Sequence, residues 1–276
     1  MTAVVLALLS AALFGGMTVG LRFGLRREPD AYAATFATAV VAFLVALAAA
    51  VAEGAAQGPD LGEAWRYLLT GLLAPGGSQI CFTLAVREAG PSRTSVAVGA
   101  APLVSVAIAL AVLGEPPRAP LLAGAALIVG GGIALAWERV RPDHFRGIGL
   151  AFALAAVVLF ALRDNLVRGL DPSRPLAAGA ATLLTGTVIG LLWARRVPPL
   201  RPFFLPGVCF GLSYVCLFEA FHHGRVSVVS PLVATESLWG VGLSALLLRR
   251  SELVGQRLLL GAALIVAGGA LIGAFR

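Results

Sequence analysis

The sequence predicts an all-α polytopic membrane protein whose ten transmembrane helices form two inverted five-helix repeats. Three observations predict this fold: an apolar composition, ten apolar runs, and a motif that occurs twice. Of the 276 residues, 59% are hydrophobic and 13% are charged, whereas about half of a typical soluble domain is apolar and about a quarter is charged. A water-soluble fold of this composition would lack the polar residues that cover a surface. The chain is therefore expected to lie in a lipid bilayer.

The length of the chain predicts how many helices cross the membrane. One crossing takes roughly 20 apolar residues, so with short connections a chain of this length holds about ten. Nothing then remains for a soluble catalytic or nucleotide-binding domain. The apolar runs predict spans at residues 3–21, 31–51, 67–86, 94–113, 119–137, 147–168, 176–194, 202–221, 226–248 and 258–275.

The breaks between these runs contain residues that end helices. Residues 26–30 (Arg-Arg-Glu-Pro-Asp) follow the first run, residues 114–117 (Gly-Glu-Pro-Pro) follow the fourth, and residues 171–175 (Asp-Pro-Ser-Arg-Pro) follow the sixth. The first run resembles a signal peptide in length. It has no basic residue before it, however, and it has a counterpart later in the chain, so we interpret it as a helix.

The last helix of each predicted half contains the same six residues. Gly-Ala-Ala-Leu-Ile-Val occupies residues 124–129 and again residues 261–266. The first copy begins nine residues after Glu115, and the second begins nine residues after Glu252. Internal repetition of this kind indicates two copies of one structural unit. We expect the copies to cover residues 1–140 and 141–276.

Each predicted copy has five spans, so the second copy enters the membrane from the opposite side. Weaker correspondences, such as Phe14 in the first span and Phe160 in the sixth, support the repeat. An inverted repeat is typical of secondary transporters, in which the substrate site lies near mid-membrane between the halves. The pattern therefore favours a machine that opens alternately to either side.

These residues resemble the EamA-type branch of the drug/metabolite transporter superfamily. The clearer copy of the family pattern runs from Pro102 through the Gly-Glu turn at residues 114–115 to Gly124. The second copy departs from it, because residues 249–252 (Arg-Arg-Ser-Glu) replace the turn and Ser237 stands where proline is common. The resemblance implies a transporter and not an enzyme, with export of amino acids, other small metabolites or toxic compounds across the inner (plasma) membrane.

The basic residues predict an orientation that conflicts with this resemblance. The net charge is +7, and all 21 basic residues are arginine. Most lie in short gaps between apolar runs, which indicates loop charge and not a nucleic-acid site. The odd-numbered connections contain 14 arginines, whereas the even-numbered ones and the C-terminus contain 6. The positive-inside rule then places both termini outside, the resemblance implies both inside, and both orientations stay open, as does the direction of transport.

Two predicted spans contain helix-breaking residues at corresponding positions. Residues 75–77 (Pro-Gly-Gly) interrupt the third span, and residues 206–207 (Pro-Gly) interrupt the eighth. Paired interruptions are typical of transporter binding sites, although proline and glycine also permit close helix packing. The polar residues that follow the interruptions are the predicted substrate-binding residues: Ser78, Gln79, Thr83, Ser213 and Tyr214.

A few ionisable residues lie inside the spans. Glu236 lies midway along the ninth span, where inserting a charge costs about 2.5–3.5 kcal/mol on translocon scales. Such a carboxylate suits a proton carrier or a partner for a cationic substrate, the alternative being a hydrogen-bonded structural acid. Arg163 and Glu219 are expected either to pair with one another or to extend toward the headgroups. Trp239, three residues after Glu236, is a candidate for stacking on a ligand.

Other classes of site have little support in the sequence. Cys81, Cys209 and Cys216 lie in apolar runs without a metal-binding pattern, so no metal or cofactor is expected. Ser213 lacks a histidine placed to activate it as an intramembrane nucleophile. The predicted partners are a small-molecule substrate, protons if transport is coupled, and lipid, without nucleic acid. The alternatives are an uncoupled facilitator, an intramembrane enzyme and a non-transporting scaffold.

Small residues in the last helix of each half predict close helix contacts. Gly269 and Gly273 have the GxxxG spacing, and Ala126 and Gly130 have a similar one. These helices are expected either to hold the two halves together or to form a homodimer contact, and the motif is too common in glycine-rich helices to decide between the two.

Overall fold

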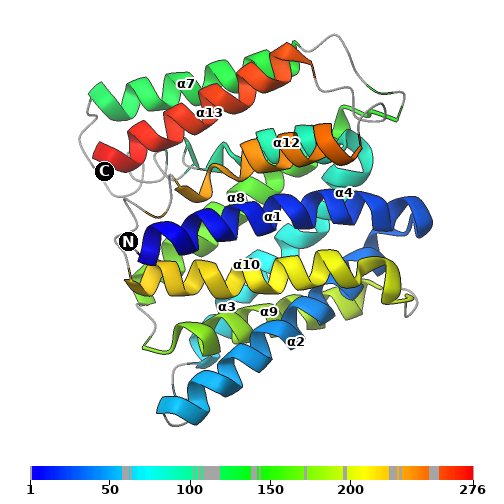
Figure 1. The fold of residues 1–276 in the computed structure, drawn as a ribbon, viewed down its shortest axis with the longest axis vertical. Coiled ribbons are helices and arrows are strands. Elements are labelled where there is room, and N and C mark those ends of the chain that lie inside the picture. The colour runs from blue at the N-terminus through cyan, green and yellow to red at the C-terminus, as the bar shows by residue number, and fades with distance from the viewer. Residues whose placement is uncertain are drawn as a thin grey trace.

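The computed structural model describes residues 2–57, 62, 64–101, 103–104, 107, 119–137, 142, 144–170, 173–194, 198–223, 229, 232–248 and 255–275. The described part consists of helices and their connections, which lie side by side in one bundle (Figure 1). The helices are α1 (Thr2–Arg27), α2 (Ala31–Gln57), α3 (Ala64–Gly71), α4 (Ser78–Ala89), α5 (Pro91–Val98), α7 (Ala119–Ala136), α8 (Ile148–Leu170), α9 (Pro175–Trp193), α10 (Phe204–His223), α12 (Glu236–Leu247) and α13 (Gln256–Phe275).

Five segments of the described chain are helical, long and apolar enough to cross a membrane. They are Thr2–Arg27, Ala31–Ala55, Trp65–Ala89, Pro175–Trp193 and Arg201–His223. Shorter apolar helices cover Ala119–Leu135, Glu236–Leu247 and Gln256–Ile272. The predicted fourth and ninth spans lie partly outside the described residues. The chain is thus an all-helical membrane protein, and the full set of ten crossings stays a prediction.

The surface and the interior have the distribution of apolar and polar side chains expected in lipid. The side chains of Leu192, Leu205 and Leu246 are 78%, 66% and 65% exposed. Gln79 and Thr83, by contrast, are almost wholly buried. Large exposed apolar surface is rare on soluble monomers, so this arrangement supports a bundle surrounded by hydrocarbon.

Helices of the first half pair with helices of the second half in a repeated pattern. The corresponding helices α2 and α9 pack together, as do α5 and α12, and α7 and α13. In the two repeats, α1 corresponds to α8 and α4 corresponds to α10. The contact of α1 with α10 therefore has its counterpart in the contact of α8 with α4. Figure 1 shows α7 and α13 as an adjacent pair at one edge of the bundle. This exchange symmetry is what a fold of two repeats predicts.

The repeated six-residue motif forms the contact between α7 and α13. A Cβ added at Gly124 would lie 2.8 Å from the carbonyl oxygen of Gly268, and one at Gly131 would lie 2.7 Å from that of Gly261. The two helices run antiparallel, and only glycine permits backbones to approach so closely. The contact therefore holds the two halves together, which was one of the two expectations for these helices.

Glu53, near the end of α2, holds the start of α9. Its carboxylate accepts hydrogen bonds from the backbone N–H of Ala177 at 3.0 Å and that of Leu176 at 3.5 Å. The first N–H groups of a helix have no partner within the helix, so Glu53 satisfies two of them from the other half of the protein.

The third span is interrupted as predicted, but the eighth is not. A π-helical turn, η1 (Leu72–Gly77), separates α3 from α4, and Ala74 within it has extended backbone angles. Thr185 of α9 donates a hydrogen bond to the carbonyl oxygen of Leu68, just before the interruption. Pro206 instead lies in the first turn of α10, where a missing N–H breaks no intrahelical bond. The predicted pair of interruptions is therefore wrong for the second half.

Candidate functional site

A buried arginine of α8 contacts two neighbours. The Nη1 atom of Arg163 donates a hydrogen bond to the hydroxyl of Tyr214 on α10 at 2.9 Å. Its Nε atom lies 2.7 Å from a carboxylate oxygen of Asp164, and its guanidinium carbon lies 5.1 Å from the centre of the Tyr214 ring. The buried charge of Arg163 is therefore balanced by Asp164, whose side chain is 37% exposed, and the guanidinium is held between α8 and α10.

The expected ion pair between Arg163 and Glu219 does not form. The Glu219 carboxylate lies 3.2 Å from Nε2 of His223, one turn further along α10, and its side chain is 24% exposed. Tyr214 and Glu219 are five residues apart, so they point in directions about 140° apart around the helix. Because Tyr214 faces α8, Glu219 faces away from it.

Glu236 lies at the very start of a helix inside the bundle. The described part of the ninth span has helical residues at 232–233 and a turn at 234–235, and α12 begins at Glu236 itself. The residue is 9% exposed. Among the described charged groups, Asp164 is the one that acts electrostatically on it. The predicted continuous helix is therefore interrupted by a turn just before the carboxylate. The backbone N–H groups of Ser237 and Leu238 already donate to the carbonyl oxygens of Ala234 and Thr235 in that turn.

Three predicted binding residues lie together at the start of α4. Ser78, Gln79 and Thr83 are 0%, 1% and 0% exposed. Their hydroxyl oxygens, and both the nitrogen and the oxygen of the Gln79 amide, lack hydrogen-bond partners within the described chain. Buried polar atoms without partners are costly and each requires an explanation. We call these three residues the α4 polar group.

Other unpartnered hydroxyls are scattered. In the described chain, Thr38, Ser92 and Ser244 are also buried without hydrogen-bond partners, but each lies on a different helix. The α4 polar group is distinctive because it gathers four unpartnered polar atoms within six residues. Gln79 and Thr83 are four residues apart, so they share one face of the helix.

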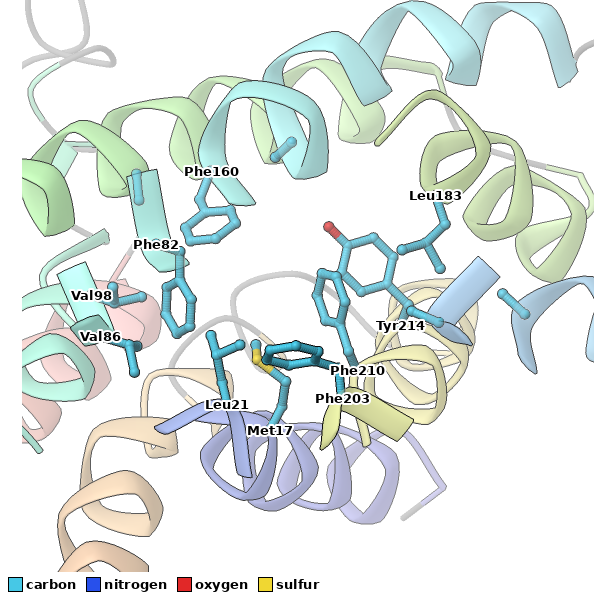
Figure 2. Packing of buried hydrophobic residues seen from close by; sticks show 14 of the residues in the cluster. Met17, Leu21, Phe82, Val86, Val98, Phe160, Leu183, Phe203, Phe210 and Tyr214 are labelled. Atoms are coloured by element: carbon cyan, nitrogen blue, oxygen red, sulfur yellow. The ribbon is translucent and has the colours of Figure 1, made fainter. Parts of the chain in front are cut away.

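Four phenylalanines from four helices meet beside these polar residues. Phe14 of α1 packs edge-to-face against Phe82 of α4, Phe160 of α8 and Phe210 of α10, with ring centres 5.2, 6.2 and 6.1 Å apart. Figure 2 shows Phe82, Phe160 and Phe210 converging on the space between these helices, with Tyr214 beside them. We call the four rings the aromatic cluster.

The aromatic cluster and the charged residues are one helical turn apart. Phe160 and Asp164 are four residues apart on α8, and Phe210 and Tyr214 have the same spacing on α10. Residues at this spacing lie one above the other on a helix face. On α12, Glu236 lies one turn before Gly240. Gly240 packs against Gly15 of α1, which is the residue after Phe14 in the sequence. The charged residues therefore form a layer next to the aromatic one.

Two predicted site residues lie elsewhere. The hydroxyls of Ser213 and Ser10 are 3.0 Å apart, and each donates to the other's backbone carbonyl oxygen, so Ser213 joins α10 to α1. Trp239 is 44% exposed, and its Cβ atom packs against Gly15 of α1. Trp239 therefore lies at the outer surface of the bundle, and among the described residues the hydroxyl of Ser213 bonds to Ser10 and not to a basic side chain.

Sequence reasoning missed several members of this arrangement. Asp164 is not among the predicted site residues, yet among the described charged groups it is the one that acts on Glu236. Phe82 and Phe210 are apolar residues within apolar runs, so nothing in the sequence distinguishes them from lipid-facing residues. The correspondence of Phe14 with Phe160 was a usable signal, because repeat-related positions meet at the interface of the halves.

Known proteins resemble the chain over nearly its whole length. The model of the EamA-like transporter family matches residues 1–137 and 147–274. No curated protein matches the chain. One solved structure, described as "Crystal structure of protein", has a TM-score of 0.66 and 20% sequence identity, covering 98% of this chain and 95% of that chain. At this level of identity the likeness shows a shared fold.

Proposed function

The chain belongs to the EamA-like transporter family, whose members are membrane transporters of the drug/metabolite transporter superfamily, and from this membership we propose that it exports a small organic solute across the inner membrane. The solute binds in a central site between the two halves and is released by alternating access. Amino acids, other metabolites and drug-like compounds are the candidate solutes.

The observation that carries the proposal is the α4 polar group beside the aromatic cluster. In a bundle that binds no ligand, an amide and two hydroxyls buried without hydrogen-bond partners only destabilise the fold. A solute with hydrogen-bonding groups satisfies them, and the aromatic rings cover its apolar part. Binding sites of this kind are mostly apolar with a few convergent polar groups.

Glu236 is the proposed site of coupling. It lies inside the bundle with Asp164 as its charged neighbour, and Asp164 is itself held by Arg163. A carboxylate in this position can exchange a proton or a substrate charge between the two sides of the membrane. In the alternative, an uncoupled facilitator, replacing Glu236 with Gln leaves both transport and its pH dependence unchanged.

An intramembrane enzyme and a non-transporting scaffold are the remaining alternatives. Counterflow of an unmodified solute in vesicles contradicts the enzyme, because the solute crosses without being converted. A scaffold has no solute ligand. Ligand binding by the purified protein therefore separates the scaffold from the transporter before any transport assay.

The first experiment measures thermal stability of the purified protein with a library of amino acids, metabolites and amphipathic drugs. A ligand at 100 times its dissociation constant stabilises the folded state by about 2.7 kcal/mol. Hits are then tested for counterflow in proteoliposomes. A chemically related set of hits that undergo counterflow supports the proposal, whereas hits that do not cross contradict it.

A matched pair of variants tests the site itself. Thr83→Val removes an unpartnered buried hydroxyl from the α4 polar group, and Thr38→Val makes the same change at an equally buried residue of α2. We expect Thr83→Val to weaken solute binding several-fold and Thr38→Val to leave it unchanged. Equal effects of the two substitutions contradict the placement of the site.

A further inference from the structure

Gln79 is the member of the α4 polar group with the most specific chemistry. Its side chain is 1% exposed, and neither its amide oxygen Oε1 nor its amide nitrogen Nε2 has a hydrogen-bond partner within the described chain. The oxygen only accepts hydrogen bonds, whereas the NH2 group only donates them. Gln79 therefore requires a partner that both donates and accepts, because a partner of one kind leaves the other atom buried and unsatisfied.

The amide of Gln79 lies on the face of α4 that carries Phe82. Phe82 and Val86 follow it by three and seven residues, so the three share one face of the helix, and the two apolar residues belong to the central buried cluster. The ring centre of Phe82 lies 5.2 Å from that of Phe14 and 6.4 Å from that of Phe160 (Figure 2). A group that pairs with Gln79 therefore has an aromatic surface one helical turn away.

The helices packed around the α4 polar group are uncharged at this level. A Cβ added at Gly77, just before the group, would lie 3.3 Å from Leu159, which places the group beside the middle of α8. Helices α1 and α2 also pack against α4. The stretches without an ionisable side chain are residues 78–86 of α4, 148–162 of α8, 10–21 of α1 and 31–52 of α2.

Charged residues further along these helices and on α5 have contacts of their own. Arg87 and Glu88, two turns beyond the α4 polar group, form an ion pair. Arg163 of α8 pairs with the carboxylate that follows it in the sequence, and Arg93 of α5 lies over the ring of Phe145. A charged group of a solute beside the α4 polar group would therefore be buried without a counter-charge, which is costly.

We propose that the transported solute is uncharged and carries a carboxamide or lactam edge on an aromatic or other apolar ring. Such an edge presents a donor and an acceptor side by side, so it exchanges two hydrogen bonds with the amide of Gln79. The hydroxyls of Ser78 and Thr83 are available for its remaining polar atoms, and the ring lies against the aromatic cluster. This inference rests on the proposed function and narrows its substrate class.

The test compares three probes that share a pyridine ring and the shape of its substituent: nicotinamide, nicotinate and 3-amidinopyridinium. The substituent donates and accepts in the first, only accepts in the second and only donates in the third. Ligand-observed NMR on the full chain in nanodiscs gives each affinity, with empty nanodiscs as the correction for partition into lipid. We expect nicotinamide to bind at least about tenfold more tightly than either ion. An ion that binds as tightly overturns the proposal, and so does failure of nicotinamide to bind.

Gln79→Met removes both polar atoms and keeps the length of the side chain. We expect nicotinamide to bind at least about tenfold more weakly to a protein that is at least as stable, because two unsatisfied buried atoms are removed. Gln256→Met makes the same change at the exposed first residue of α13 and is expected to leave the affinity unchanged. Parental affinity in Gln79→Met overturns the proposal. A loss of stability also overturns it, because Gln79 is then bonded within the bundle.

Gln79→Glu tests the pairing itself. A carboxylate pairs with an amidinium through two charge-assisted hydrogen bonds, so we expect 3-amidinopyridinium to bind this variant more tightly than nicotinamide does. Gln256→Glu is the control and should retain the parental order of the three probes. The parental order in Gln79→Glu contradicts the placement of the solute at this residue.

Counterflow of the same probes in proteoliposomes, with protein-free liposomes as the correction for passive entry, separates this inference from the function on which it rests. A nicotinamide preference in binding without counterflow of nicotinamide contradicts transport and leaves the carboxamide site standing. Counterflow of other solutes without a nicotinamide preference supports transport and overturns the carboxamide site.

Discussion

Phe14 and Phe160 are each the thirteenth residue of the first helix of their half, and their rings meet edge-to-face with centres 6.2 Å apart. Two positions that the repeat makes equivalent are therefore in contact at the centre of the bundle. The contact joins α1 to α8, and Phe82 and Phe210 complete the cluster on either side. The middle of the protein is thus built from both repeats, as the proposed central site requires.

Tyr214→Phe is expected to lower the stability of the protein by about 1–3 kcal/mol, because it leaves a buried charged donor of Arg163 without its acceptor. Thermal denaturation in detergent measures the change. Tyr32→Phe is the control, since the ring of Tyr32 stacks on Trp193 and its stacking survives loss of the hydroxyl. A Tyr214→Phe protein as stable as the Tyr32→Phe protein contradicts the role given to this hydrogen bond.

Gly131→Ala is expected to destabilise the protein by about 1–3 kcal/mol, because the new methyl group overlaps the backbone of α13. Gly132→Ala, one residue further along, has open space around it. It should be neutral or slightly stabilising, since alanine favours the helix by about 1 kcal/mol. Thermal denaturation of both variants under the same conditions measures the difference in stability. A Gly132→Ala protein less stable than the Gly131→Ala protein contradicts the α7–α13 contact.

Ser213→Ala is expected to separate packing from binding. Its hydroxyl bonds Ser10 of α1, and interhelical hydrogen bonds of this kind contribute about 0.6 kcal/mol in membrane proteins. We expect a small loss of stability and unchanged solute affinity, measured by thermal denaturation and calorimetry. A large loss of affinity at full stability would return Ser213 to the binding site.

Glu53→Ala is expected to cost about 0.5–2 kcal/mol of stability, because the start of α9 loses its capping acceptor. Glu53→Gln retains one acceptor oxygen and should cost less. Hydrogen exchange at Leu176 and Ala177 locates the effect, since both N–H groups lose protection only in the alanine variant. Unchanged exchange at these two amides speaks against capping from α2.

The sequence predicted the class of fold because it depends on composition and on the repeated motif, which are visible in one chain. It also placed Gln79, Tyr214 and Glu236 inside the bundle, because polar residues in apolar runs are conspicuous. It did not distinguish Ser213 from Tyr214. Neighbouring residues differ by 100° around a helix, and a helix that is apolar on most faces gives no signal of which direction is inward.

Partners were harder to predict than positions. Arg163 was expected to reach Glu219, but in the structure it contacts Tyr214 and Asp164. The rotation of α10 decides between these partners, and α10 is packed closely against α2, where a Cβ at Gly207 would overlap Val41. Contacts between helices distant in the sequence therefore determine which charges meet.

The contact of α7 with α13 has a consequence for how the protein changes shape. Its two glycine pairs bring backbone against backbone, about two turns apart, which leaves little room for the two helices to slide past one another. We expect this pair to serve as a stationary frame, while the helices around the aromatic cluster tilt against it. In the proposed alternating-access mechanism, the motif that appears twice in the sequence therefore lies in the part of the protein that stays fixed.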